Sequence, residues 1–211
     1  MMRWQTTSRL TLNCSSFVIS LSRNYTKYAP FQTAPTADYS TPPTLNPATT
    51  GPNAHLQDEQ NFFADVASGD LPPVSFVKPI GKNNEHPSYT DVVTGQQHVA
   101  DLVAAVQKST IWQDCVIIIT YDENGGWDHV VPPVRKDAWG VGVRVPGIII
   151  SPFARKGSID HTEYETVSIL KLMERRFNLA PLSARDSDPA VNDLTNALHF
   201  GRDSEHQHND D

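Results

Sequence analysis

The stretch Cys115-Val-Ile-Ile-Ile-Thr-Tyr-Asp-Glu-Asn-Gly-Gly-Trp-Asp-His129 changes character after Tyr121. Residues 115–121 are mostly apolar and β-branched, which is typical of a strand that is buried on both faces. Strands of this kind belong mainly to parallel sheets that are covered by helices. We therefore predict that 115–121 is the central strand of an α/β fold.

Acidic side chains and a histidine follow this expected strand at once. Asp122, Glu123 and Asp128 supply carboxylates, and His129 supplies an imidazole. Ligands of parallel α/β sheets bind beyond the carboxyl ends of the strands, so these residues are candidates for a ligand site. Carboxylate oxygens suit Mg²⁺, Ca²⁺ or Mn²⁺, and carboxylates combined with imidazole also suit Zn²⁺. A metal ion and a phosphate are the ligands that this composition favours.

The same stretch allows two other interpretations. The simpler one is a solvated acidic turn after a strand, and the residues alone leave it open. The other is a calcium-binding loop of the EF-hand type, which Asp122, Asn124 and Asp128 match at positions 1, 3 and 7. Gly126 and Pro133 fall at positions 5 and 12, where ligands are required, so the pattern argues against an EF-hand.

Two more clusters could carry chemistry. The loop Lys78-Pro-Ile-Gly-Lys-Asn-Asn-Glu-His-Pro87 follows an expected strand and contains two lysines and His86, a mixture that could bind phosphate oxygens. The dipeptide Asp160-His161 precedes an expected helix, where His161 could also simply cap or pack the helix. An ordinary surface loop and an ordinary helix start are the alternatives for these two clusters.

The hydrophobic periodicity of the rest of the sequence predicts the other helices and strands. We expect helices at about 58–67, 94–108 and 162–177, and further strands at 74–77 and 141–151. The third helix is expected to begin with a capping box of Thr162 and Glu165. Pro146 indicates a sheet edge or a bend in the last strand. Strands that alternate with helices indicate a mostly parallel sheet flanked by helices.

The two ends of the chain differ in composition from the middle. Residues 1–51 are rich in Ser, Thr, Pro and Asn and are predicted to be a low-complexity, disordered or aberrant segment. The apolar stretch 10–21 is a poor match to a signal peptide, and the absence of acids before residue 38 resembles a transit peptide, so the compartment stays open. Residues 199–211 are predicted to be a charged tail, leaving 52–198 as the folded domain.

Composition excludes several classes of protein. The formal net charge of -7 over 211 residues argues against nucleic acid as the main partner. No run of about 18 apolar residues predicts a membrane span. Of the two cysteines, Cys115 is expected to be a buried thiol rather than half of a disulfide with Cys14. The chain contains no Gly-x-Ser-x-Gly elbow, P-loop, Cys-x-x-Cys or dinucleotide-binding fingerprint.

Ten short motifs, taken in order, resemble a known family. They are Val74-Ser-Phe-Val-Lys-Pro, Asn84-Glu-His-Pro, Gly95-Gln-Gln-His-Val, Ile119-Thr-Tyr-Asp-Glu-Asn-Gly-Gly, Asp128-His-Val, Pro132-Pro, Arg144-Val-Pro, Ile149-Ile-Ser-Pro-Phe-Ala, Asp160-His-Thr and Ser168-Ile-Leu-Lys. Over residues 52–198 the chain resembles the carboxyl-terminal part of the phosphoesterase family that includes bacterial phospholipases C and AcpA-type acid phosphatases. The order of so many motifs makes the resemblance specific.

The resemblance implies a fold, a reaction and a ligand. The fold would be a partial alkaline-phosphatase-like core, and the reaction would be metal-dependent hydrolysis of a phosphate ester. The substrate would be a small phosphate ester or a phospholipid head group, and the cofactor would be a divalent ion such as Ca²⁺, Zn²⁺, Mg²⁺ or Mn²⁺. Members of the family are often secreted or periplasmic.

The resemblance also implies roles for particular residues. Asp122 and Glu123 resemble the metal-binding acidic pair of the family. His86 resembles a catalytic histidine that contacts phosphate or protonates the leaving group. His129 matches a motif near the active site and is the second catalytic candidate. Asp128, together with Asp160 and His161, is expected to lie around the site without binding the metal directly.

The chain also departs from the family pattern. Residues 1–51 contain no counterpart of the family's amino-terminal metal-binding motif or of its nucleophilic Ser or Thr, so the nucleophile is unknown. Only Trp127 separates Gly125-Gly126 from Asp128-His129, whereas many members have two residues there. Two hypotheses follow: a metal-dependent phosphoesterase that is incomplete on this chain, or a catalytically inactive remnant that at most binds metal or phosphate weakly.

Overall fold

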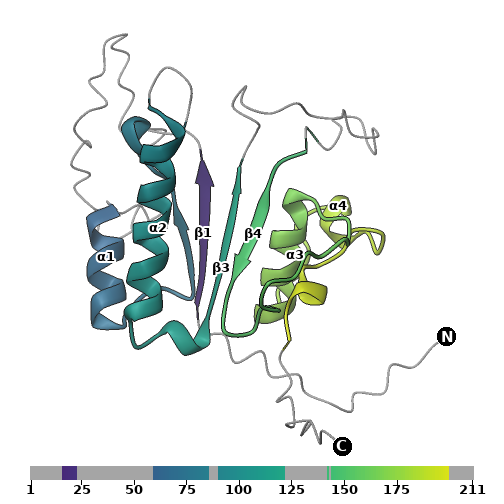
Figure 1. Ribbon diagram of the computed structural model, residues 1–211. Helices are drawn as coiled ribbons and strands as arrows, with labels where there is room; N and C mark the ends of the chain where they lie inside the picture. Colours follow the sequence, from purple (N-terminus) through teal and green to yellow (C-terminus); the bar gives the residue numbers. More distant parts are fainter. Residues whose placement is uncertain (1–15, 23–58, 86–89, 122–141, 143, 200–211) are drawn as a thin grey trace, which may run out of the picture. The chain divides into compact units, whose positions relative to one another are not determined.

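The computed structural model describes residues 16–22, 59–85, 90–121, 142 and 144–199 (Figure 1). The chain divides into two compact units. The first, called the sheet unit below, is Cys14–Pro152. The second, called the C-terminal unit, is described over residues 153–199. Each unit is described by itself.

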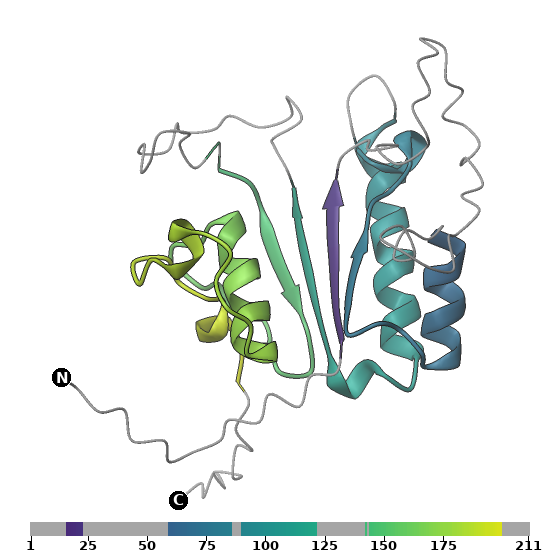
Figure 2. The ribbon, with the colours of Figure 1, turned by 180° about the vertical axis from the view of Figure 1, so that it is seen from behind.

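The sheet unit contains a four-stranded sheet with the strand order β2-β1-β3-β4. Strand β1 (Ser16–Ser22) runs parallel to β2 (Val74–Val77) on one side and to β3 (Cys115–Tyr121) on the other. Strand β4 (Gly147–Ile150) pairs with β3 in the antiparallel sense and lies at the edge. Figure 2 shows the same strand order from behind. Helices and strands therefore combine in an α/β arrangement around a mixed sheet.

Strand β1 differs from what the sequence predicts for the amino-terminal segment. Disorder is expected over residues 1–51, but Ser16–Ser22 forms a strand between two others, with Phe17 opposite both Val74 and Val116. The physical reason is that aromatic and β-branched residues in this short stretch favour a strand, although serines and asparagines surround it. The rest of residues 1–51 lies outside the described part of the chain.

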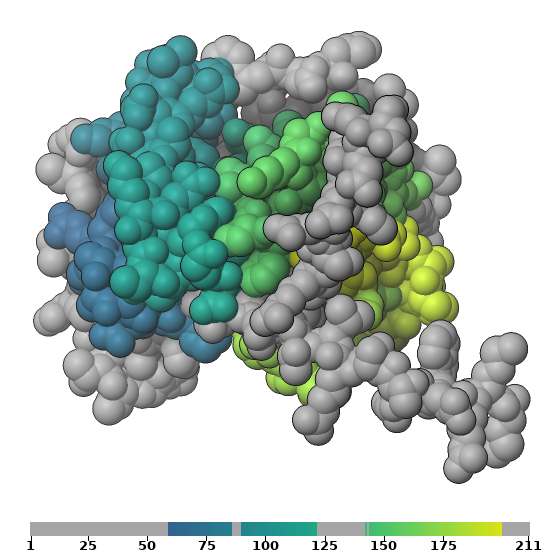
Figure 3. Space-filling model, turned by 60° about the horizontal axis from the view of Figure 1, so that its bottom comes forward, coloured from purple at the N-terminus to yellow at the C-terminus, as the bar shows by residue number. Residues whose placement is uncertain are grey.

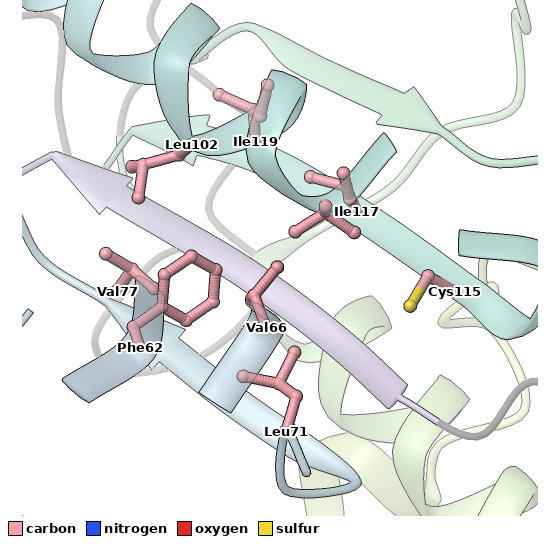
Figure 4. Close-up of a cluster of buried hydrophobic side chains, with 9 residues drawn as sticks. Phe62, Val66, Leu71, Val77, Leu102, Cys115, Ile117 and Ile119 are labelled. Atoms are coloured by element: carbon pink, nitrogen blue, oxygen red, sulfur yellow. The ribbon is translucent and has the colours of Figure 1, made fainter. Parts of the chain in front are cut away.

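Helices α1 (Glu59–Ser68) and α2 (Val92–Lys108) lie side by side on one face of this sheet (Figures 1 and 3). Because side chains alternate along a strand, Cys115, Ile117 and Ile119 of β3 point to the same face. They form a buried cluster with residues of α1, β2, α2 and the connection between α1 and β2, most of which Figure 4 labels. The cluster contains Phe62, Val66, Leu71, Val77, Leu102, Val106, Cys115, Ile117 and Ile119. The predicted helices and the buried Cys115 thiol are confirmed.

The last strand of the sheet is shorter than predicted. A strand is expected over 141–151, but β4 begins only after Pro146 and ends at Ile150. Pro146 has no backbone N–H to donate to a neighbouring strand, which places it at the start of an edge strand. Its carbonyl accepts a hydrogen bond from Thr120 Oγ1 at 3.1 Å. The single-turn helices η1 (Gly81–Asn83) and η2 (Trp112–Asp114) lie in connections of the same unit.

The C-terminal unit is built around helix α3 (Thr166–Phe177), with the short helices α4 (Ala184–Ser187) and η3 (Thr195–Ala197). The expected capping box of Thr162 and Glu165 is wrong. The helix is instead capped by Glu165, whose backbone N–H donates to Ser168 Oγ at 2.9 Å. Thr162 lies four residues before the first helical residue, and its N–H donates to Asp160 Oδ1 in a preceding turn instead of pairing with Glu165. No helix among the described residues is long and apolar enough to cross a membrane.

A pair of carboxyl groups links α3 to α4 inside the C-terminal unit. Asp186 is 1% exposed, and it accepts hydrogen bonds from Ser183 Oγ, Ser183 N and Leu182 N. These bonds, above all the one from the Ser183 hydroxyl, lower the pKa of Asp186. Glu174 is buried as well, and burial together with a hydrogen bond to Asp186 raises the pKa of Glu174. The pKa values of the two carboxyl groups thus shift in opposite directions.

Helix α2 offers a matched test of the core. Val106 is fully buried and Val93 is 74% exposed, yet both lie on the same helix. Val106→Ala should lower the free energy of unfolding by about 1.5–3 kcal/mol, because it removes two buried carbon groups and leaves a cavity. Val93→Ala should change it by less than about 0.5 kcal/mol. Urea unfolding followed by circular dichroism measures both, and equal losses would contradict the packing described here.

The carboxyl pair predicts a particular pH dependence of stability. A raised pKa in the folded state means that the folded protein binds more protons than the unfolded protein between the ordinary pKa of 4.5 and the folded value. The contribution of Glu174 is therefore full below pH 4.5 and is lost as the pH rises through its folded pKa. Glu174→Gln, which replaces the titrating carboxyl group by an amide, should remove this loss. Melting temperatures from pH 4 to 8 test this, and profiles of equal slope would refute it.

Candidate active site

Two connections of the sheet unit meet at the carboxyl ends of parallel strands. Strands β2 and β3 both run parallel to β1, so their carboxyl ends lie at the same edge of the sheet. The chain leaves β2 at Val77 and reaches Glu85 by way of η1, and it leaves β3 at Tyr121. The segment 78–85 is called the β2 loop below. His86 follows the first of these segments directly, and Asp122 and Glu123 follow the second.

A hydrogen bond joins the two segments at this edge. The Tyr121 hydroxyl donates to Glu85 Oε2 at 3.1 Å, and both side chains are half-buried. Burial raises the pKa of the Glu85 carboxyl, although the bond from Tyr121 opposes that shift. Burial and the charge of Glu85 raise the pKa of Tyr121 to about 12. The tyrosine is therefore protonated at neutral pH and serves as the donor.

The β2 loop lies directly against helix α2 at a glycine. A Cβ atom placed on Gly95 would come within 2.1 Å of Glu85 Cγ, 2.9 Å of Glu85 N and 3.2 Å of Asn83 O. Only a residue without a side chain allows this approach. Glu85 itself has a φ of 63°, a left-handed conformation that is uncommon for a residue other than glycine. The loop is therefore held in a specific conformation on the surface of the helix.

A histidine fixes the same loop to both helices. His98 Nε2 lies 2.9 Å from Glu59 Oε2 at the start of α1, and His98 Nδ1 lies 3.3 Å from Asn83 Nδ2 in η1. These partners fit a ring that donates from Nε2 to the carboxylate and accepts at Nδ1 from the amide. Side-chain exposure of His98 is only 11%. His98 thus connects α1, α2 and the β2 loop.

A small hollow opens between the β2 loop and the end of β3. It is lined by Pro79, Asn83, Asn84, Glu85, Val99, Ile119, Thr120 and Tyr121. Asn84 is only 1% exposed, so the hollow has a well-packed polar wall. Its position beyond the carboxyl ends of β2 and β3 is where parallel sheets bind their ligands.

The catalytic and metal candidates lie next to this hollow in the sequence. His86 follows Glu85 immediately, and Asp122 and Glu123 follow Tyr121. These three residues, with Asp128 and His129, lie outside the described residues, so their roles stay predictions. Within the described part of the chain, no three His, Cys, Asp or Glu side chains gather as a group that could hold a metal.

Asp160 and His161 belong to the C-terminal unit. Asp160 Oδ1 accepts from Thr162 N at 2.9 Å, and Oδ2 accepts from the Tyr164 hydroxyl at 2.6 Å. These bonds, with that of Tyr164 the strongest, lower the pKa of Asp160. His161 is exposed. The bonds of Asp160 organise the turn before α3, and its predicted place around the active site stays a prediction.

Four residues around the hollow were not among the candidates that the sequence suggested. Glu85, Gly95, His98 and Tyr121 all lie within the quoted motifs, but none was assigned a role. A signal was available for Glu85 and Tyr121, since each directly precedes a candidate. No local pattern could have shown that Gly95 and His98 contact the β2 loop, because those contacts join distant parts of the chain.

An α/β sheet with acidic and histidine-bearing segments after its parallel strands is typical of proteins that bind a ligand at the carboxyl edge of the sheet. Comparison with known proteins makes this class specific. Residues 10–180 match the model of the phosphoesterase family. The chain therefore belongs to the phosphoesterase family. The match includes β1, whereas the motifs quoted above begin at residue 74.

The relatives are phospholipases C from bacteria and a plant. Phospholipase C B of Mycobacterium tuberculosis is 32% identical over 165 residues, covering 66% of this chain and 32% of the relative. Non-specific phospholipase C6 of Arabidopsis thaliana is 33% identical over 168 residues, covering 64% and 32%. Non-hemolytic phospholipase C of Pseudomonas aeruginosa is 25% identical over 169 residues, covering 64% and 24%. The match thus spans about a third of each relative or less.

Gly95 provides a direct test of how the β2 loop is placed. Alanine in a helix interior normally stabilises by about 1 kcal/mol relative to glycine. Gly95→Ala should nevertheless lower the free energy of unfolding by roughly 1–3 kcal/mol, because the new methyl group collides with Glu85.

The exposed position Ala100 on the same helix supplies the control. Ala100→Gly should cost about 0.5–1 kcal/mol and so report helix propensity alone. Urea unfolding of the two variants and the parent decides the matter. A Gly95→Ala protein that is more stable than the parent would show that the loop does not lie against Gly95.

Proposed function

We propose that this chain forms the metal-binding half of a site for phosphate ester hydrolysis. Membership of the phosphoesterase family and the similarity to proteins named phospholipase C support this proposal. The observation that carries it is the 3.1 Å hydrogen bond between Tyr121 and Glu85. It brings together the ends of the two segments from which Asp122, Glu123 and His86 continue.

Asp122 and Glu123 are the residues that would hold the metal ion. Their carboxylate oxygens are donors that divalent ions such as Ca²⁺, Mg²⁺, Mn²⁺ and Zn²⁺ accept. When bound, the ion supplies positive charge that polarises phosphoryl oxygens. His86 would contact the phosphate or give a proton to the leaving oxygen, and His129 is the second candidate for proton transfer. Asp128 would support this group from the same segment.

The substrate class follows from the family and its named members. It is a phosphate ester, either a small molecule or a phospholipid head group. The proposed core is a partial alkaline-phosphatase-like domain, and the mixed sheet with its parallel β2-β1-β3 part is compatible with it. No Ser or Thr of this chain is assigned as the nucleophile.

A catalytically inactive form is the second candidate. It is favoured by the missing assignment of a nucleophile among the residues of this chain. Such a protein would bind a metal ion or phosphate weakly without turning over an ester. Both candidates share the metal site at Asp122 and Glu123, and they differ in turnover.

The test combines metal binding with hydrolysis. Asp122→Ala/Glu123→Ala should weaken the binding of Mn²⁺, measured by calorimetry, by about 100-fold or more, since even indirect support of a metal ligand is worth 10–100-fold. Hydrolysis of p-nitrophenyl phosphate and p-nitrophenyl phosphorylcholine is assayed beside it with Ca²⁺, Mg²⁺, Mn²⁺ and Zn²⁺.

A second double variant controls for lost charge. Asp70→Ala/Asp101→Ala removes two exposed acids and should leave Mn²⁺ binding unchanged. Equal binding by all three proteins would refute the proposed metal site. Metal binding without hydrolysis under any of the four ions would support the inactive form, and hydrolysis lost only in Asp122→Ala/Glu123→Ala would support the enzyme.

A further inference from the structure

We propose that Glu85 and Tyr121 are positioning residues that set the spacing between the phosphate-contacting and metal-binding segments. The proposal rests on the function proposed above, since it concerns the same site. Neither residue is given a role as a ligand. Their hydrogen bond of 3.1 Å is a contact between side chains that are 36 positions apart in the sequence.

The first step is that each partner is adjacent to a predicted functional residue. Glu85 precedes His86, and Tyr121 precedes Asp122 and Glu123. Consecutive Cα atoms are held about 3.8 Å apart, so a displacement of the backbone at Glu85 or Tyr121 also displaces the residue that follows. The bond therefore connects the two segments at the places where spacing matters most for a phosphate held between them.

The second step is that one end of the connection is rigid. Tyr121 is the last residue of β3, which is paired on both sides by β1 and β4. Strand residues Ile117, Ile118 and Ile119 are between 2% and 5% exposed. The tyrosine therefore extends from the end of a strand whose preceding residues are buried.

The third step is that specific contacts hold the β2 loop in its conformation. Glu85 has a left-handed backbone, which costs free energy unless surrounding contacts maintain it. Gly95 allows the end of the loop to lie against α2. The hydrogen bond between Asn83 and His98 attaches the loop to α2 two residues before Glu85. The hydrogen bond from Tyr121 ties the end of the loop to β3. Strained backbone held by specific contacts is common at functional sites.

The consequence separates two kinds of binding. A metal ion held by Asp122 and Glu123 uses only the segment after β3, whereas a phosphate that also contacts His86 uses both segments. Loss of the bond should therefore weaken phosphate binding more than metal binding. A merely structural role would weaken both only to the extent that the protein unfolds.

The experiment uses Tyr121→Phe and a matched tyrosine. Tyr164 also donates its hydroxyl to a carboxylate, that of Asp160 at 2.6 Å, but in the C-terminal unit. Tyr121→Phe should weaken the binding of inorganic phosphate to the Mn²⁺-loaded full chain by about 10-fold, the size of one lost hydrogen bond. It should leave Mn²⁺ affinity within about 2-fold. Tyr164→Phe should change neither affinity, and both proteins should remain folded.

Variants of Glu85 test whether a remaining acceptor preserves phosphate binding and whether Glu85 and Tyr121 act through one bond. Glu85→Gln keeps an acceptor for Tyr121 and should bind phosphate nearly as the parent does, whereas Glu85→Ala should resemble Tyr121→Phe. Because the two residues act through one bond, Tyr121→Phe/Glu85→Ala should be no weaker than either single variant. Additive losses, or equal phosphate affinity in Tyr121→Phe and the parent, would overturn the positioning role.

Hydrogen exchange gives a readout that needs no metal. Glu85→Ala should speed exchange in the peptide around 119–126, and Tyr121→Phe should speed it around 78–90, while Tyr164→Phe changes neither. Absence of this reciprocal effect would overturn the proposal even if phosphate binds. If the parent binds neither Mn²⁺ nor phosphate, the proposed function fails, and the exchange data still decide whether the two segments are coupled.

Discussion

Burial of β3 is the constraint on which the rest of the sheet unit depends. Residues 115–119 are between 0% and 5% exposed, so the strand is covered on both faces. A strand in that environment must satisfy its backbone groups on both edges, which β1 and β4 do. Its apolar side chains also form the wall against which α1 and α2 pack (Figure 4). The end of such a strand is a fixed point from which a functional segment can be presented.

The parallel pairing of β1 with two neighbours brings the ends of β2 and β3 to the same edge of the sheet. Because β2 and β3 point the same way, the segments that leave them begin at the same edge. The β2 loop contacts α2 at Gly95, and Glu85 at the end of the loop accepts a hydrogen bond from Tyr121. Polar groups that are far apart in the sequence thus come together beside a hollow with a buried asparagine in its wall.

The chain belongs to the phosphoesterase family, and the residues proposed to bind metal and phosphate continue from this edge of the sheet. The similarity to phospholipases C spans about a third of each relative or less, so the sheet unit and the C-terminal unit correspond to a part of those proteins. That part contains an acidic pair and a histidine of the kinds that bind metal ions and phosphate. In the proposed function these residues continue from segments that are anchored to a buried strand.

The sequence alone determined the buried strand at 115–121, both helices of the sheet unit and the family, because these depend on local composition and on ordered motifs. It misplaced the start of β4 and the cap of α3, where one proline and one competing aspartate turn decide the boundary. It also missed β1, since seven residues give too weak a signal when their partners are unknown. Only the tertiary structure brought Glu85 to Tyr121 and Gly95, because contacts between distant segments follow from packing and leave no local pattern.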